Sequence, residues 1–253
     1  MSRDARSDKN NKTKVKTKTA GEPQPPRGRL AHLWHEWVRP LLVVGIVLLS
    51  VRSSLADWND VPSGSMKPTI LEGDRVFVNK LAYNLNFPFT SWSLAHWADP
   101  TRGDIVVLWS PYDGKRLVKR LVAVPGDVLE VRRHRLIVNG QPAMYEPLPP
   151  DYLRRAGITQ PERELHDIET VAGRSHAVMA NSAEVARASF GPVRLPEGKY
   201  FMMGDHRDDS FDSRFFGFVD RWRIVGRATA VVLSLDINHG WRPRWSRFFT
   251  RLK

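Results

Sequence analysis

One long apolar run, residues 41–51 (LLVVGIVLLSV), stands out in the hydropathy pattern of the chain. Alone it is shorter than the ~20 residues that a membrane-spanning helix needs. Tryptophans flank it, and the 21 steps from Trp37 to Trp58 at ~1.5 Å each give about 32 Å, close to the ~30 Å of a hydrocarbon core. We therefore predict a single transmembrane helix over residues 37–57, with an arginine near each end that can reach the lipid headgroups.

After Trp58 the pattern changes to short runs rich in Val, Ile and Leu that Gly, Pro and Asp interrupt, as is typical of β-strands. The runs are 75–78, 104–109, 117–124, a hairpin of 128–131 with 136–138, then 199–203 and 224–235. Strands do not alternate with helices, which favours antiparallel pairing. We predict a mainly β protein with an antiparallel, barrel-like β core formed by residues 58–140 and 196–238.

Two segments fall outside this strand pattern. Residues 141–195 open with prolines, carry many charges and have few apolar runs, so we predict an inserted subdomain packed on the core. Residues 1–36 form a basic N-terminal tail, in which residues 1–29 have almost nothing to bury and are predicted to be disordered.

Residues 239–253 form a basic aromatic C-terminal segment. Its large apolar residues recur at i, i+4, i+7, i+8 and i+11, the spacing of one helical face, and are Trp241, Trp245, Phe248, Phe249 and Leu252. Two alternatives stay open. The segment docks its aromatic side chains on the β core, or it forms a helix that lies on the anionic outer leaflet of a membrane.

The charge of the chain is unevenly distributed. The net charge is +12, and residues 1–39 hold ten Lys or Arg against four Asp or Glu, which gives +6. Because basic residues beside a spanning helix stay in the cytoplasm, we predict that the tail is inside the cell and the β core outside. The chain has no cysteine, which excludes disulfides, a thiol nucleophile and thiolate metal sites.

A turn rich in proline, glycine and serine follows the apolar run. Residues 61–70 (VPSGSMKPTI) hold Ser63 and Ser65 between two prolines, and such a turn can present a hydroxyl as a nucleophile. A serine needs a base to take its proton, and no Ser-His-Asp arrangement is apparent. Lys119 is the better candidate, since it lies in a strand-like run on the same face as Leu117 and Leu121.

Five ordered motifs make the sequence recognisable. They are PSGSM at 62–66, EGD at 72–74, RGDIVV at 102–107, VKR at 118–120 with PGD at 125–127, and GDHRDDSFDSR at 204–214. In this order they resemble the sequence boxes of type I signal peptidases. The resemblance covers roughly residues 40–127 and 196–235, and an ordered set is much more specific than any one motif.

The resemblance implies a role for each matching residue. Ser65 would be the nucleophile and Lys119 the general base, while the Ser65 backbone N–H and the Ser63 hydroxyl would stabilise the oxyanion. Ser210 would orient the lysine amine. The supporting charged residues would be Arg120, Asp205, Asp212 and Arg214. His206 departs from the pattern, because such enzymes usually have asparagine there.

Four carboxylates crowd the segment 204–214, but it lacks the glycine and the final glutamate of a calcium loop. Pairs between arginine and carboxylate that fix the loop are the better interpretation. We therefore expect no metal ion and no cofactor.

The resemblance also implies the substrate and the location. The substrates would be secretory preproteins, cut after a small-x-small motif and bound as an extended strand against the β core. The enzyme would be a single-pass protein of the cytoplasmic membrane, with its catalytic domain on the outer face. Membrane lipids are expected partners, and nucleic acid is not.

Three alternative interpretations fit the sequence less well. Ser54-Leu55-Ala56 has the form of a cleavage site, but the preceding tail is too long for a cleaved signal peptide. A self-cleaving repressor-type Ser/Lys peptidase would need a DNA-binding domain in place of residues 1–58. A non-catalytic membrane-anchored module that binds anionic lipid or nucleic acid would not need to keep both Ser65 and Lys119.

Overall fold

The computed structural model describes residues 32–90, 92–155, 164–181, 189–238 and 240–252. The chain divides into two compact units, Met1–Gly45 and Ile46–Lys253. The predicted disorder of residues 1–29 concerns a part of the chain that lies outside the described residues, so it stays a prediction.

The predicted membrane-spanning segment is helical. A π-helical turn, η1 (Trp34–Val38), continues into α2 (Arg39–Ser54), and together they form a helix of 21 residues that is long and apolar enough to cross a membrane. At ~1.5 Å per residue the helix is about 32 Å long. The aliphatic side chains from Leu41 to Leu49 are each more than 50% exposed in the protein alone. The helix ends before the predicted boundary at residue 57, because Ala56 and Asp57 already belong to the first strand.

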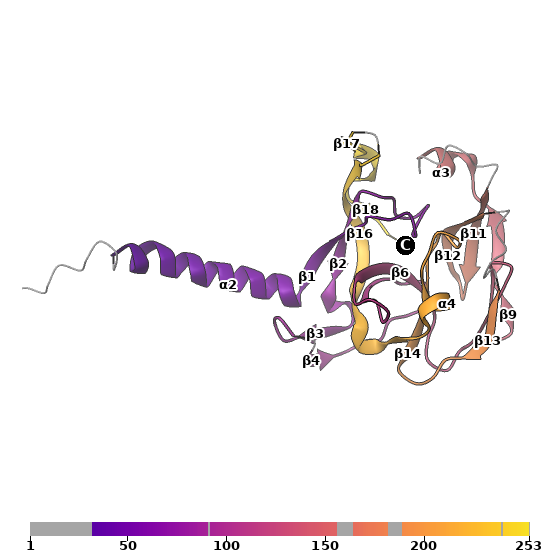
Figure 1. Ribbon diagram of the computed structural model, residues 1–253, viewed down its shortest axis with the longest axis horizontal. Helices are drawn as coiled ribbons and strands as arrows, with labels where there is room; N and C mark the ends of the chain where they lie inside the picture. The colour runs from indigo at the N-terminus through magenta and orange to yellow at the C-terminus, as the bar shows by residue number, and fades with distance from the viewer. Residues whose placement is uncertain (1–31, 91, 156–163, 182–188, 239, 253) are drawn as a thin grey trace, which may run out of the picture. The chain divides into compact units, whose positions relative to one another are not determined.

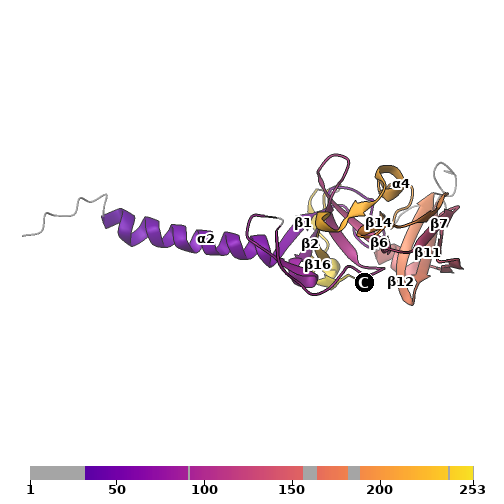
Figure 2. The ribbon, with the colours of Figure 1, turned by 90° about the horizontal axis from the view of Figure 1, so that it is seen from below.

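An antiparallel sheet forms the core of the second unit, as the sequence predicted. Its strands follow in the order β1-β2-β16-β5-β6-β14-β15. Their bounds are Ala56–Asp60, Asp74–Asn79, Ile224–Asp236, Ile105–Trp109, Arg116–Ala123, Lys199–Met203 and Val219–Asp220. Figures 1 and 2 both show β1, β2 and β16 side by side. The short helices η2 (Lys80–Ala82) and η4 (Arg221–Arg223) and the hairpin of β3 (Asn84–Asn86) with β4 (Ser93–His96) connect these strands.

The two faces of the sheet bury different side chains, because successive residues of a strand point to opposite faces. Ile105 and Val107 of β5 pack with Val118 in one cluster, and Val106 and Leu108 pack with Leu121 in another. This alternation decides the direction of every polar side chain on β6. Lys119 and Arg120 must therefore point to opposite faces.

The inserted region contains regular structure that the sequence pattern did not predict. It forms β9 (Gln141–Pro142), β10 (Met144–Pro147), α3 (Pro150–Arg155), β11 (Glu164–Val171), β12 (Arg174–Asn181) and β13 (Phe190–Arg194). β10, β11 and β12 make a three-stranded sheet, while β13 and β9 flank the predicted hairpin of β7 (Val128–Arg132) with β8 (Arg135–Val138). Figures 1 and 2 show β11 and β12 on the side away from β1 and β2. The sequence missed β11 and β12 because neither alternates: β11 buries the polar Glu169, and β12 buries the consecutive residues 176–180.

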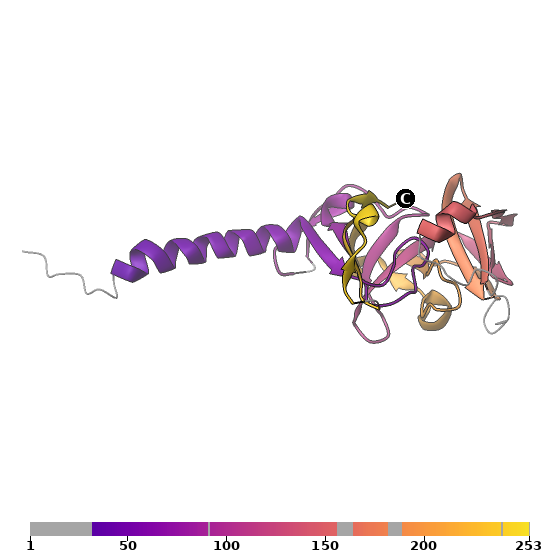
Figure 3. The ribbon, with the colours of Figure 1, turned by 90° about the horizontal axis from the view of Figure 1, so that it is seen from above.

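The C-terminal segment is not the helix that its apolar spacing suggested. It forms β17 (Arg242–Pro243), a 3₁₀ turn η5 (Trp245–Arg247) and β18 (Thr250–Arg251). β18 pairs with Ala230 and Val231 of β16, on the edge that β5 leaves open beyond residue 227. The segment and β16, both yellow, lie together in Figure 3. The segment thus packs on the core, but not through its aromatic side chains: backbone pairing, Leu252 and the side chains of Arg244 and Arg247 make the contact, while Trp241 and Trp245 remain exposed.

Candidate active site

Ser65 and Lys119 are in direct contact. The Nζ atom of Lys119 donates a hydrogen bond of 2.5 Å to the Oγ atom of Ser65. Both side chains are buried, with 3% of Lys119 and 8% of Ser65 exposed. The two residues lie 54 positions apart in the sequence, so the fold alone brings them together.

Backbone hydrogen bonds and buried side chains hold the turn that carries Ser65 in place. The backbone N–H of Lys67 donates to the Gly64 carbonyl at 2.9 Å, and that of Ile70 donates to Met66 at 2.9 Å. The side chains of Met66 and Ile70 are buried in the core. The charged ends of two side chains approach Gly64 closely, since a Cβ there would lie 2.9 Å from Glu72 Oε1 and 3.0 Å from Asp209 Oδ2. A side chain at this position would therefore displace the ends of these two flexible side chains.

Burial changes the acidity of Lys119. Desolvation lowers the pKa of its ammonium group from 10.5 to about 8, although the negative charges of Asp212, Asp205 and Asp209 act in the opposite direction. Desolvation prevails because the amine is enclosed by the protein and cannot be solvated by water. A lysine with this pKa loses its proton much more readily than a surface lysine.

The hydroxyl of Ser63 lies next to that of Ser65. Its Oγ atom is 3.5 Å from Ser65 Oγ, and the residue is exposed to solvent. A donor in this position can reach an oxygen atom that develops negative charge beside Ser65.

Ser210 is held by a carboxylate. Its Oγ donates to Asp212 Oδ2 at 2.7 Å, and Asp212 also accepts from the Gly204 N–H at 3.0 Å and from Arg214 Nε at 2.8 Å. Asp212 is fully buried and caps the short helix α4 (Ser213–Phe216). Within the described residues Ser210 donates to Asp212 and has no hydrogen bond to Lys119. Its closeness to the site comes through Gly204, where a Cβ would lie 2.3 Å from Ser210 Oγ and 2.4 Å from the Ser65 carbonyl.

Arg120 and Asp205 form a buried ion pair on the other face of β6. Two nitrogens of Arg120 each donate to one oxygen of Asp205 at 2.8 Å. Burial would raise the pKa of the Asp205 carboxyl, but the charge and hydrogen bonds of Arg120 hold it below its usual value. Asp205 Oδ2 also accepts a hydrogen bond from Thr69 Oγ1 at 2.5 Å. The pair therefore ties β6 to the loop that carries Ser65.

His206 contributes to the site through its backbone. Its N–H donates to the Ser65 carbonyl at 3.2 Å, while its ring lies 3.8 Å from the Asp209 carboxylate. A backbone contact does not depend on the type of side chain, so a histidine in place of asparagine leaves this hydrogen bond unchanged.

Sequence reasoning missed a second buried network that the inserted strands provide. Arg207 Nη2 donates to Glu169 Oε1 at 2.7 Å, and the ring of His176 lies 3.2 Å from the same oxygen. Met179 of β12 donates its N–H to the Asp205 carbonyl and accepts one from Arg207. The insertion thus supports the loop 204–214 from outside. β11 and β12 do not alternate apolar and polar residues, so their sequence gave no sign of strands. The only sign of this network in the sequence was the charged residue Arg207 within the motif at 204–214.

Within the part of the chain that the structure describes, no three His, Asp or Glu side chains are grouped to hold a metal ion. The carboxylates of Asp205 and Asp212 are instead bound by Arg120 and Arg214.

Comparison with known proteins gives consistent matches. A family model described as signal peptidase, peptidase S26, matches residues 34–233. Signal peptidase I of Pseudomonas fluorescens is 33% identical over 213 residues, which cover 79% of this chain and 72% of that protein. Signal peptidase I P of Bacillus subtilis subsp. natto is 32% identical over 203 residues, 79% of this chain and 90% of that protein.

A solved structure also matches. It is the crystal structure of a signal peptidase I from Enterococcus faecalis V583, with 32% sequence identity, coverage of 52% of this chain and 98% of that chain, and a TM-score of 0.32.

Proposed function

Because the chain belongs to the signal peptidase family, peptidase S26, and is a serine peptidase that removes signal peptides, we propose that Ser65 and Lys119 are its catalytic dyad. The observation that carries this proposal is the buried hydrogen bond of 2.5 Å between Lys119 Nζ and Ser65 Oγ. A nucleophile within hydrogen-bond reach of a base is the arrangement that acyl transfer requires.

The reaction follows from this geometry. The neutral amine of Lys119 takes the proton of Ser65 Oγ as the oxygen attacks the scissile carbonyl carbon. The carbonyl oxygen becomes an oxyanion, to which the Ser65 N–H and the Ser63 hydroxyl donate. The C–N bond then breaks, and the Lys119 ammonium returns its proton to the leaving amine. Water, activated by the same lysine, hydrolyses the ester and releases Ser65.

The lowered pKa makes Lys119 an effective base. With a pKa of about 8, the amine is neutral in about 10% of molecules at pH 7. A lysine with the ordinary value of 10.5 would be neutral in about 0.03%. Burial therefore raises the fraction of reactive enzyme by roughly 300-fold.

We propose that the substrate binds as an added β-strand and is cut after a small-x-small motif. β14 pairs with residues 120–123 of β6, so it leaves an edge of β6 open from Arg116 to Lys119 in the described structure. An extended peptide on that edge would form main-chain hydrogen bonds and pass beside Ser65. The motif preference is the one that the resemblance to signal peptidases implied.

We further propose a single-pass protein with its tail in the cytoplasm and its catalytic unit on the outer face of the membrane. The helix Trp34–Ser54 has the required length, and the net charge of +6 in residues 1–39 favours a cytoplasmic tail. Ser65 follows Ser54 by only eleven residues. The short distance along the chain supports cleavage close to the membrane surface, where preproteins emerge.

The direct test is cleavage of a purified preprotein by the full chain in neutral detergent, with wild type and Ser65→Ala side by side. We expect wild type to release the signal peptide, with a cut after a small-x-small motif that N-terminal sequencing of the mature product identifies. Folded Ser65→Ala should release none. Cleavage by the variant at the wild-type rate would assign the activity to other residues.

A further inference from the structure

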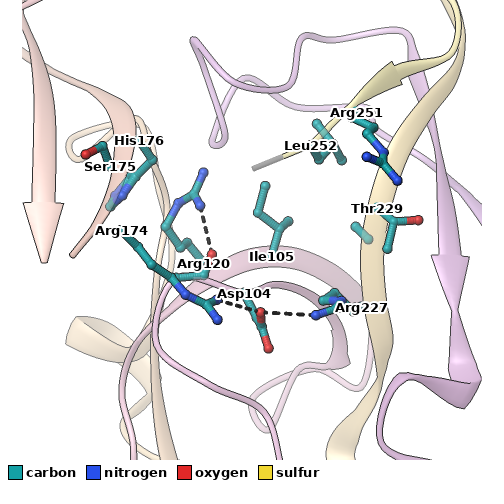
Figure 4. A pocket seen from close by; sticks show the side chains of 12 residues that line it. Asp104, Ile105, Arg120, Arg174, Ser175, His176, Arg227, Thr229, Arg251 and Leu252 are labelled. Carbon is teal, nitrogen blue, oxygen red and sulfur yellow. Dashed lines mark hydrogen bonds and ion pairs between the residues drawn. The ribbon is translucent and has the colours of Figure 1, made fainter. Parts of the chain in front are cut away.

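A basic cavity of about 520 Å³ lies on the face of β6 that Lys119 does not share. Arg120 points into it, and the other walls come from β12, β16 and β18. Figure 4 shows the side chains around it, of which the ionisable ones are Asp104, Arg120, Arg174, His176, Arg227 and Arg251. The cavity is separate from the dyad because neighbouring residues of β6 point to opposite faces.

The cavity wall has more positive than negative charge. Arg174 and Arg227 approach Asp104 from opposite sides (Figure 4) and share one of its oxygens, with Nη1 atoms at 3.0 and 3.7 Å. The other oxygen of Asp104 accepts hydrogen bonds from the Tyr83 hydroxyl at 2.9 Å and the Thr101 N–H at 3.0 Å. The carboxylate of Asp104 is thus the ion-pair partner of two guanidinium groups.

The remaining arginines do not change this imbalance. Arg120 is neutralised by Asp205. Arg251 is exposed and has no ion pair among the described residues. Three arginines therefore face one carboxylate, which leaves a surplus of two positive charges on the wall. Such a fork of guanidinium groups matches the oxygens of a phosphate.

The buried ring of His176 adds a polar atom without a partner. Only 4% of its side chain is exposed, and its Nδ1 atom has no hydrogen-bond partner among the described residues. Burial, followed by the charge of Arg120, lowers the pKa of His176, which favours the neutral ring. Nε2 lies 3.2 Å from Glu169 Oε1 without the geometry of a hydrogen bond, and in the tautomer that carries the proton on Nε2 the Nδ1 atom can accept a hydrogen bond from a hydroxyl group.

A second cavity of about 650 Å³ adjoins the first and is mainly apolar. The two share Ser175, His176, Arg251 and Leu252 in their walls. The apolar lining of the second cavity is Leu148, Tyr152, Ile168, Ala177, Val231 and Leu252. Its size is within the range of about 300–1,000 Å³ that is usual for ligand sites.

We propose that the two cavities together bind one anionic phospholipid, with its phosphodiester at Arg174, Arg227 and Arg251 and an acyl chain in the apolar cavity. Charge complementarity selects an anion, and the adjoining apolar walls select an amphiphile over a free phosphate. A headgroup that carries hydroxyls, such as phosphoglycerol, would also supply the donor for His176. The choice of a membrane lipid rests on the proposed location of the enzyme.

The bound lipid would contact the support of the catalytic loop at two points. Thr69 lines the apolar cavity and donates to Asp205, and Arg120, which binds Asp205, lines the basic cavity. The ligand therefore touches both ends of the chain Thr69, Asp205, Arg120. Lipid binding at this site is therefore coupled to the rigidity of the loop that carries Ser65.

The test is lipid retention by the full chain in dodecyl maltoside, measured by native mass spectrometry. Phosphatidylglycerol is titrated against phosphatidylcholine with the same acyl chains. We expect one phosphatidylglycerol per chain, and weaker retention by about tenfold or more in Arg174→Gln/Arg227→Gln, which removes two charge-assisted contacts. Ser175→Trp, an exposed position between the two cavities, should block binding. The matched control, Arg132→Gln/Arg194→Gln, alters two exposed arginines elsewhere and should bind as wild type does.

Three outcomes would overturn the proposal. The first is equal retention of both lipids by wild type, and the second is unchanged retention by both cavity variants. The third is binding of glycerol 3-phosphate that excludes the lipid, which would assign the site to a free phosphate. Peptide cleavage by the same samples, with Ser65→Ala as the blank, reports the catalytic proposal separately, because none of these arginines contacts the dyad.

Discussion

Arg120 binds Asp205 through two hydrogen bonds of 2.8 Å, directly behind the point where its neighbour Lys119 binds Ser65. The fold thus uses two consecutive residues of β6 for two purposes. Lys119 contacts Ser65 on one face, and Arg120 anchors the loop that carries Ser65 on the other, through Asp205 and Thr69.

Asp205→Asn should destabilise the protein strongly. The change leaves the guanidinium of Arg120, which is only 2% exposed, without a negative partner, and breaking a buried pair costs about 3–5 kcal/mol. Denaturant unfolding of the catalytic unit measures this loss. Asp60→Asn, which breaks the exposed pair with Arg75, is the control and should change stability by less than about 1 kcal/mol. Equal effects of the two variants would contradict a special role of the buried pair.

Lys119→Arg should be inactive even though it keeps the positive charge. A guanidinium with a pKa above ~12 cannot act as a base near pH 7, so preprotein cleavage should fall by at least about 10³-fold. Lys119→Met, which keeps the length of the side chain without the amine, should be equally inactive and fold well. Circular dichroism and thermal unfolding confirm the fold of each variant. Substantial turnover by Lys119→Met would remove Lys119 from the dyad.

The rate should follow the ionisation of Lys119. Because its pKa is about 8, kcat/KM should rise about tenfold per pH unit below pH 8 and level off above it. The measurement is cleavage of a short peptide between pH 6 and 9.5, with the stability of the enzyme checked at each value. A profile that is flat from pH 6 to 8 would show that another group acts as the base.

The same pKa predicts how stability depends on pH. Between about pH 8 and 10.5 the unfolded chain holds the proton of Lys119 while the folded protein has lost it. Stability therefore rises with pH in this window, and the cost of burying the ammonium is complete below pH 8. Lys119→Met lacks this cost, so its advantage in free energy of unfolding over wild type should shrink from pH 8 to pH 10.5. An advantage that stays constant would mean that the amine is not desolvated.

Ser210→Ala should slow catalysis with little loss of stability. Ser210 donates to Asp212 and lies beside Gly204, which the Ser65 carbonyl also adjoins, so its loss should disturb positioning, by up to about 10²-fold in kcat. Ser213→Ala is a matched control in the same loop, since Ser213 accepts a hydrogen bond from the Met202 N–H away from the dyad. Wild-type kinetics in Ser210→Ala, or an equal loss in both variants, would contradict the positioning role.

The proposed topology can be checked with protease added to intact spheroplasts. Residues after the helix should be degraded, while an epitope placed in residues 1–36 should be protected until the membrane is opened. The reverse pattern of protection would place the catalytic unit in the cytoplasm.

The sequence by itself determined much of this protein. The apolar run with flanking tryptophans predicted the helix, and short aliphatic runs predicted five strands of the core and the hairpin of β7 with β8, because burial on alternate positions leaves a direct trace in the sequence. The motifs around Ser65 and Lys119 also pointed to the pair. Strand alternation alone was enough to place Arg120 on the opposite face from Lys119.

Only the tertiary structure decided the rest. Strand β11 buries the charged Glu169, and β12 buries five consecutive residues from His176 to Ala180, so neither strand shows the period of two that marks a half-buried strand. The spacing of Trp241 to Leu252 favoured a helix, yet the open edge of β16 offered backbone hydrogen bonds that local preference could not foresee. The contact between Lys119 and Ser65, the burial that lowers the pKa of the lysine and the partner of Ser210 all depend on residues far apart in the chain. Local sequence determines the preference of a segment for helix or strand. The solvation of a side chain and its distance from a side chain far away in the sequence are set only when the chain folds.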